Sequence, residues 1–343
     1  MSATLAPGDL SIRVAVEASR VVSVEIRPSR PVSLVSRFAG RPVEAVAIAM
    51  ARINAVCGRS HGLGVRLAAM AALRQSPDRA FLASALAGLA SERAGEHLKS
   101  LMLAAGNHLE LADPDLVALR AGFAAARALE QAAATADLAR LRPLFAALPP
   151  AVAAAGRLIA SPLPEAGALA VPDVLSQTDD TAVIAGLVAD PGFARVPALS
   201  GRRPETGPPA RAGISAADGL GAAHARLTEI VAAVAVLDAT LGGADLPAIA
   251  PWFDFAPLAP GEGFAAIETP RGRLHYWLRV ADGLVMAARA VAPTEWNFHP
   301  AGPFAAALAG AAVGADPAAD IARRAAAFDP CVAVRIEIVA ADA

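Results

Sequence analysis

The sequence predicts a mainly helical α+β protein, organised as a single domain over residues 1–343. Long segments without proline carry apolar residues at three- and four-residue steps, which is typical of helices packed on a core. Short alternating segments near both ends of the chain predict strands instead. Hydrophobic residues make up 55% of the chain and charged residues 18%, a composition that argues against disorder.

Residues 10–27 are predicted to form an amino-terminal β-hairpin. Apolar side chains alternate there with polar or small ones in two successive sets. The first set is Leu10, Ile12, Val14 and Val16, and the second is Val22, Val24 and Ile26.

Helices are predicted in five segments that keep a helical apolar period and begin at favourable residues. Gly58, Gly62 and Gly64 follow the first of these segments and are expected to interrupt regular structure. The five predicted helices run from Pro42 to about Cys57, from Ser76 to about Ala105, from Asp113 to about Ala134, over 214–241 and over about 316–327.

The carboxy-terminal third is predicted to hold a small antiparallel sheet, because aromatic and branched residues are separated there by short turns. Its strands are expected over 264–269, 274–280 and 284–291, with a last strand over 331–339. Residues 200–213 have the proline, glycine and charge content of an exposed linker. Residues 246–263 contain too many prolines for regular structure to be expected.

Charge and composition restrict the possible partners. A formal charge of −2 gives no basic field for nucleic acid. Charged residues, glycine or proline interrupt the apolar runs before about 20 residues accumulate, so no membrane span is predicted. The amino terminus shows no signal sequence, and the only cysteines are Cys57 and Cys331, which together favour a cytoplasmic protein without a disulfide framework.

Four segments carry the chemical information of the sequence. They are RINAVCGRSH at 52–61, EGFAAIETPRGRLHYW at 262–277, APTEWNFHP at 292–300 and FDPCVAVRIE at 328–337. In order and spacing they resemble four landmarks of the large subunit of nickel–iron hydrogenases. The resemblance spans most of the chain and thins between about 140 and 245. It implies a hydrogenase large-subunit-like helical bundle between the hairpin and the small sheet.

The first landmark departs from the family motif at one metal ligand. The family has Arg-x-Cys-x-x-Cys-x-x-x-His, in which both cysteines bind nickel and the second also bridges to iron. Arg52, Cys57 and His61 match this motif, whereas Asn54 replaces the first cysteine. By itself His61 is interpreted as a hydrogen-bonded structural residue.

The last landmark departs more strongly. The family motif is Asp-Pro-Cys-x-x-Cys-x-x-His, and Asp329, Pro330 and Cys331 match its beginning. Val334 stands in place of the second cysteine, and Glu337 in place of the histidine. Four thiolates therefore become two, and an amide and an isopropyl group cannot replace the soft ligands that nickel needs. The comparison implies no nickel and no nickel–iron turnover.

The proton relay of the family is also altered. Its first strand begins with Glu-Gly-His-Leu, and the matching stretch here is Pro7 to Leu10. Proline cannot carry a proton. We therefore expect no hydrogenase activity, and an enzyme with residual redox chemistry is the least favoured interpretation.

Two positions on the iron side are retained. Arg271, in the PRG turn, and Thr294 match family residues that contact the cyanide ligands of iron. The resemblance is therefore to the large-subunit-like accessory proteins of hydrogenase operons, the HupK/HoxV type. It implies a non-catalytic scaffold that holds the iron–dicyanide–carbonyl unit between Cys57 and Cys331, with Arg271 and Thr294 binding the unit. The implied partners are the hydrogenase large-subunit precursor and hydrogenase maturation factors.

Alternatives remain at this stage. A metal-free degenerate large subunit could act as an interaction protein or chaperone in hydrogenase assembly and would need neither cysteine. His97, His108, His224 and His299 lack metal-ligand spacing and are assigned no role. Large-subunit precursors are cut after the final histidine, whereas here IVAADA follows Glu337 as the end of a strand. We expect no processing of this tail.

Overall fold

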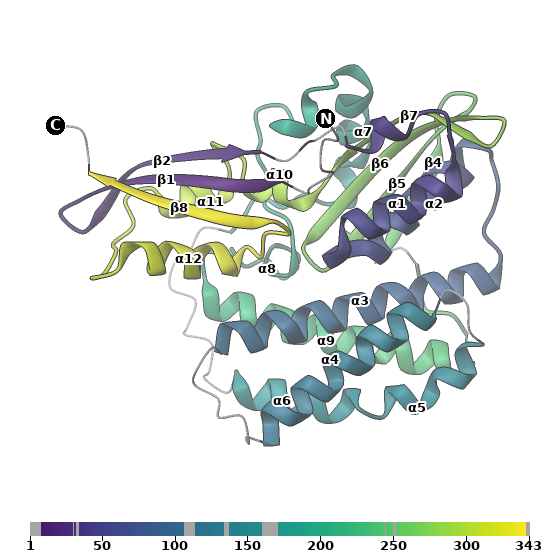
Figure 1. Cartoon of the computed structure of the whole chain (residues 1–343), viewed down its shortest axis with the longest axis horizontal. Coiled ribbons are helices and arrows are strands. Elements are labelled where there is room, and N and C mark those ends of the chain that lie inside the picture. The colour runs from purple at the N-terminus through teal and green to yellow at the C-terminus, as the bar shows by residue number, and fades with distance from the viewer. Residues whose placement is uncertain are drawn as a thin grey trace, which may run out of the picture.

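The computed structural model describes residues 8–29, 31, 34–105, 114–133, 137–159, 171–243, 245–249 and 252–340. A bundle of long helices lies on one side of the molecule, and two small sheets lie on the other (Figure 1). This is the mainly helical α+β architecture that the sequence predicts. Pro7, the first residue of the altered relay stretch, lies outside the described residues, as do the expected helix limits Asp113 and Ala134.

The bundle is built on α3, the Pro-free segment whose helix was predicted from Ser76. Helix α3 packs against both α4 and α9, and α6 packs against α4. Their shared core is aliphatic and includes Leu98, Leu119 and Ile230. The bounds are Arg79–Ala105 for α3, Pro114–Ala132 for α4, Leu148–Leu158 for α6 and Gly219–Leu241 for α9.

Helix α9 is, within the described residues, the one helix long and apolar enough to cross a membrane, with a mean hydropathy of 1.5. It also carries Arg226 and Glu229, and both are engaged inside the protein. Arg226 donates a hydrogen bond to the Ala327 carbonyl, and Glu229 pairs with Arg211. These contacts, together with its packing on α3, make α9 a core helix of the bundle.

The first sheet joins the two ends of the chain. The predicted hairpin is confirmed as β1 (Asp9–Glu17) and β2 (Arg20–Pro28), which pair antiparallel. The predicted last strand, β8 (Ala333–Ala340), adds to β1 in parallel rather than joining the second sheet, with Leu10 opposite Val334. Helix α12 (Pro317–Ala327) covers the inner face of this sheet (Figure 1).

The second sheet has the strand order β3-β7-β6-β5-β4 and contains the three predicted strands. The expectation that residues 246–263 lack regular structure was wrong, because β4 forms inside them. Strand β4 lies at the sheet edge, where Pro257 can end a strand without removing a needed hydrogen bond. The bounds are Arg41–Pro42 for β3, Phe253–Pro257 for β4, Glu262–Thr269 for β5, Gly272–Ala281 for β6 and Leu284–Val291 for β7.

Helix α1 (Val43–Ile53) and a 3₁₀ turn, η2 (Ala55–Cys57), lead directly into α2 (Gly58–Ala72), which packs on β5 and β6. The expected break at the three glycines was wrong, since all of them lie within α2. Close packing explains them instead. A Cβ atom at Gly64 would lie 2.7 Å from Cδ2 of Tyr276, and one at Gly58 would lie 2.6 Å from the Ala51 carbonyl oxygen.

The expectation of an exposed linker over 200–213 was wrong in its centre, because residues 204–210 are buried. This stretch packs on the turn between β5 and β6, where a Cβ atom at Gly207 would lie 3.0 Å from the Arg271 carbonyl oxygen. The remaining helices are α5 (Arg142–Phe145), α7 (Asp180–Ala189), α8 (Pro208–Arg211), α10 (Pro293–Asn297) and α11 (Pro303–Leu308), with 3₁₀ turns at Leu34–Phe38, Leu138–Leu141, Gln177–Asp179 and Phe193–Arg195.

Candidate two-cysteine metal site

Cys57 and Cys331 line one cavity of about 140 Å³. Cys57 ends η2 between α1 and α2, and Cys331 directly precedes β8. Both are free thiols; Cys57 is buried and Cys331 is half-buried. The rest of the cavity wall is formed by Ile53, Asn54, Ala55, Val56, His61 and Val332.

Arg271 reaches the site from the turn between β5 and β6. Its Nη1 donates to the Sγ atom of Cys57 at 3.2 Å and to the Val56 carbonyl at 3.2 Å. Its Nη2 donates to Glu96 at 2.9 Å and to Asp329 at 3.4 Å. Burial opposes the guanidinium charge, but the carboxylates of Asp329 and Glu96 outweigh that effect and keep the pKa of Arg271 well above its usual value. Arg271 therefore supplies a permanent positive charge beside Cys57.

Thr294 reaches the other thiol from α10. Its Oγ1 lies 3.1 Å from the Sγ atom of Cys331 and also accepts a hydrogen bond of 3.4 Å from the Cys331 backbone N–H. Thr294 is itself buried. Each cysteine is thus in contact with one of the two side chains that the sequence comparison singled out.

The protonation state of Cys57 is set mainly by burial. Burial raises the pKa of this thiol far above its usual value, and the neighbouring Arg271 lowers it only in part. Cys57 is therefore a neutral thiol at neutral pH in this arrangement. A soft metal would have to displace the proton in order to bind the sulfur.

Comparison with known proteins relates the sequence to hydrogenase expression/formation proteins and the fold to hydrogenases. The family model for nickel-dependent hydrogenase matches residues 221–336. The hydrogenase expression/formation protein HupK of Rhizobium leguminosarum bv. viciae is 35% identical, with 100% of each chain covered. The hydrogenase expression/formation protein HoxV of Cupriavidus necator is 31% identical, with 87% of this chain and 88% of that protein covered.

The chain belongs to the HupK/HoxV family of hydrogenase expression/formation proteins. Its fold is that of hydrogenase large subunits. A chain of the Ni-Fe-Se hydrogenase from D. vulgaris Hildenborough superposes with a TM-score of 0.62 at 16% identity, with 93% of this chain and 95% of that chain covered.

A segment that the sequence comparison did not single out braces both donors of this HupK/HoxV-family site. The Oγ1 atom of Thr206 accepts a hydrogen bond of 2.9 Å from the Arg273 backbone N–H, two residues beyond Arg271. The Asn297 side chain accepts from the Thr206 N–H and donates to its carbonyl, both at 2.9 Å. Residues around Thr206 therefore tie the Arg271 turn to α10, which carries Thr294.

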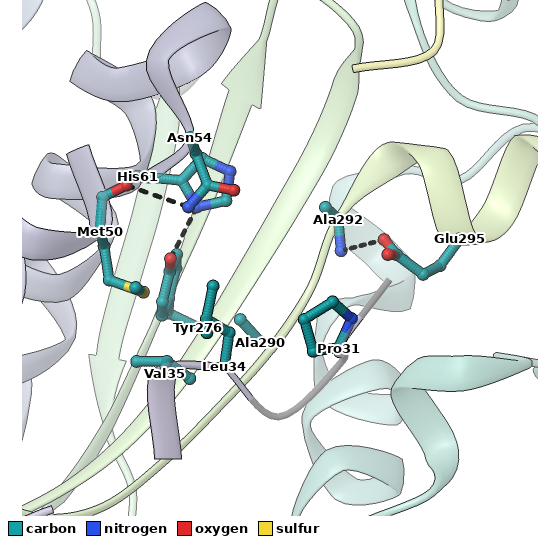
Figure 2. Close-up of a pocket in the computed structure, with 10 residues that line it drawn as sticks. All are labelled: Pro31, Leu34, Val35, Met50, Asn54, His61, Tyr276, Ala290, Ala292 and Glu295. Carbon is teal, nitrogen blue, oxygen red and sulfur yellow. Dashed lines mark hydrogen bonds between the residues drawn. The ribbon is translucent and has the colours of Figure 1, made fainter. Parts of the chain in front are cut away.

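Asn54 and His61 also line a second, smaller cavity of about 40 Å³ (Figure 2). The Asn54 Nδ2 donates to the Met50 carbonyl at 3.0 Å, within its own helix end. His61 Nδ1 lies 2.7 Å from the Tyr276 hydroxyl, which agrees with its interpretation as a hydrogen-bonded structural residue. The amide that replaces a family thiolate thus caps α1.

Glu96 is a site residue that sequence reasoning missed. It lies buried in α3 and forms ion pairs with both Arg271 and Lys99. The signal in the sequence is the charged run SERAGEHLK within an otherwise apolar helix. The helical period alone could not show which of these charges point toward the cysteine cavity.

Proposed function

We propose that this chain is a non-catalytic scaffold that transiently holds the iron–dicyanide–carbonyl unit between Cys57 and Cys331. The unit is cargo, and its destination is the hydrogenase large-subunit precursor. The observation that supports this most is that two cysteines from opposite ends of the sequence line one cavity. The family name, hydrogenase expression/formation protein, agrees with a role in assembly.

The donor set suits an iron that arrives with ligands of its own. Among the described residues, no group of three or more His, Cys, Asp or Glu side chains is arranged to hold a metal ion. A bare metal ion in a structural site usually takes four protein ligands. Iron that already carries two cyanides and one carbonyl needs fewer, and thiolate sulfur is a suitable partner for it.

Arg271 and Thr294 provide the hydrogen-bond donors that such a cargo requires. Metal-bound cyanide is an anionic acceptor, and a buried guanidinium and hydroxyl are suitable donors to it. Each already contacts one of the two thiols, so a group bound between the sulfurs would lie beside both donors.

Transient holding also follows from the burial of Cys57. Burial favours the neutral Cys57 thiol. The thiol must therefore lose its proton when iron binds to the sulfur, and it takes up a proton again when the iron leaves. With only two thiolates, the scaffold binds the unit less firmly than a four-thiolate nickel–iron site. We infer that this difference drives the transfer toward the precursor.

The family positions that would support turnover are directed elsewhere. Asn54 caps its own helix, and Glu337 lies on the exposed face of β8, where it pairs with Arg13 at 3.2 Å. Neither residue supplies the missing nickel ligand. A cytoplasmic scaffold that acts with maturation factors is therefore favoured over a redox enzyme.

Substitution of the cysteines tests the proposal. Cys57→Ser and Cys331→Ser should each leave a folded chain and reduce its iron content by about tenfold or more, because a hydroxyl is a harder and less acidic ligand. Val56→Ala changes the wall of the same cavity without removing a side-chain donor and serves as the control. If both serine variants support full hydrogenase activity in cells, the metal-free interaction protein is the better account.

A further inference from the structure

A third cavity, larger than the two described above, lies at one end of the bundle. It measures about 630 Å³ and is enclosed by the end of α3, the start of α9, α12 and β8. Its wall is mostly apolar, formed by Leu101, Leu103, Ala223, Ala325, Val334 and Ile336 among others. The volume lies within the range of about 300–1,000 Å³ that is typical of small-molecule sites.

Arg226 gives this apolar cavity a buried positive charge. Its side chain lines the cavity and is 5% exposed. One nitrogen, Nη2, donates to the Ala327 carbonyl at 2.6 Å, whereas the buried Nε has no hydrogen-bond partner. Burial lowers the pKa of Arg226, and Asp329 is the main group that opposes this effect.

The other charged residues of the wall already have ionic partners. Lys99 pairs with Glu96, Arg323 pairs with Asp320, and Asp329 pairs with Arg271. Within the part of the chain that the structure describes, no carboxylate lies within 4.0 Å of the Arg226 guanidinium. A buried guanidinium with no carboxylate at ion-pair distance is costly, and an anionic ligand bound directly to it would reduce that cost.

We propose that this cavity binds a long-chain aliphatic monocarboxylate, with its carboxylate on Arg226 and its chain along the apolar wall. A guanidinium binds a carboxylate in bidentate geometry, which accounts for the head group. A peptide fits less well, because its own N–H and C=O groups would face leucine, alanine, valine and isoleucine without partners.

The cavity is separate from the cysteine site and lies next to it. Asp329 and Pro330 line the cavity of about 630 Å³, and the next two residues, Cys331 and Val332, line the cysteine cavity of about 140 Å³. Binding of the carboxylate does not require iron. It can therefore be measured on the metal-free chain, independently of the scaffold proposal.

Calorimetric titration of the full chain with decanoate tests the proposal. We expect saturable binding of one decanoate per chain, and binding of decanol, which lacks the carboxylate, that is weaker by about tenfold. Arg226→Gln should weaken decanoate binding by about tenfold or more. Arg324→Gln, on α12 but not among the residues that line the cavity, is the matched control and should change it little.

A cavity-filling variant keeps the test decisive if Arg226→Gln does not fold. Ala223→Phe should abolish decanoate binding while the circular dichroism spectrum stays that of the parent chain. Absence of saturable binding would overturn the proposal, as would decanol binding as tightly as decanoate. Native mass spectrometry that finds a peptide in place of an aliphatic acid on protein from its own cells would also overturn it.

Discussion

The Nη1 atom of Arg271 lies 3.2 Å from the Sγ atom of Cys57, although 214 positions separate the two residues in the chain. Thr294 stands in the same relationship to Cys331, with 3.1 Å between Oγ1 and Sγ. One donor lies in the turn between β5 and β6 and the other in α10. Each donor therefore contacts one thiol, and the two thiols come from opposite ends of the chain. This pairing of donor and thiol underlies the proposed cargo site.

The role of the Thr294 hydroxyl can be separated from that of its bulk. Thr294→Val keeps the shape of the side chain and removes the donor, and we expect iron retention to fall by about tenfold. Thr294→Ser keeps the hydroxyl and should retain most of the iron. Iron analysis after gel filtration measures both variants. Equal retention by the two would contradict a donor role.

The carboxy-terminal tail should remain uncut. Residues of β8 pair with β1 along their length, from Asp9 opposite Ala333 to Val16 opposite Ala340. The described part of the tail is therefore docked on β1, and Cys331 directly precedes it. Intact-mass measurement on protein from its own cells should give the full-length chain. A species that ends near Glu337 would indicate a maturing enzyme instead.

Glu92 should make stability depend on pH. Its carboxylate is buried and accepts hydrogen bonds from the backbone N–H groups of Arg59 and Ser60, at the start of α2. Burial, with Glu130 adding to it, raises the pKa of Glu92 from 4.5 to about 8. Between pH 4.5 and about pH 8 the folded chain keeps a proton on Glu92 that the unfolded chain loses. The contribution of Glu92 to the free energy of unfolding is therefore greatest below pH 4.5 and decreases as the pH rises to about 8.

Glu92→Gln should remove this decline. The change in free energy of unfolding, variant minus parent, should become more positive between pH 5 and pH 8, by an amount on the order of a few kcal/mol. Urea denaturation at a series of pH values measures it. A difference that stays constant with pH would show that Glu92 ionises normally in the folded chain.

The glycines of α2 should be sensitive to an added methyl group. Gly64→Ala would place Cβ 2.7 Å from Tyr276 and should destabilise the chain by about 1–3 kcal/mol. Gly156→Ala, in α6, meets no atom within 4 Å and should stabilise it by about 0.5–1 kcal/mol. Thermal unfolding of the pair provides the comparison. Destabilisation of equal size at both positions would rule out packing against Tyr276 as the cause.

The elements that the sequence predicted well are those with a clear period. The hairpin over 10–27, the long helix that ends at Ala105 and the three central strands of the second sheet all have regular apolar spacing. The parallel addition of β8 to β1 was not predictable in this way. It depends on contacts between residues more than 300 positions apart, on which the local pattern carries no information.

Only part of the candidate site could be predicted from the sequence, because the local pattern carries no information on distant contacts. Cys57, Cys331, Arg271 and Thr294 were found because they stand in motifs that resemble those of a known family. Glu96 and Thr206 lie outside those motifs, in a predicted helix and in a predicted exposed linker respectively. Their burial comes from tertiary packing, which overrides the usual exposure of charged residues and of proline-rich segments.

The infrared spectrum of the protein purified anaerobically from its own cells tests the central claim most directly. Metal-bound cyanide and carbonyl absorb infrared light at frequencies where protein does not, so their bands detect the bound unit directly. The scaffold account predicts two cyanide bands and one carbonyl band in the parent chain, and their loss in both Cys57→Ser and Cys331→Ser. A parent chain without these bands, taken from cells that are assembling active hydrogenase, would contradict it.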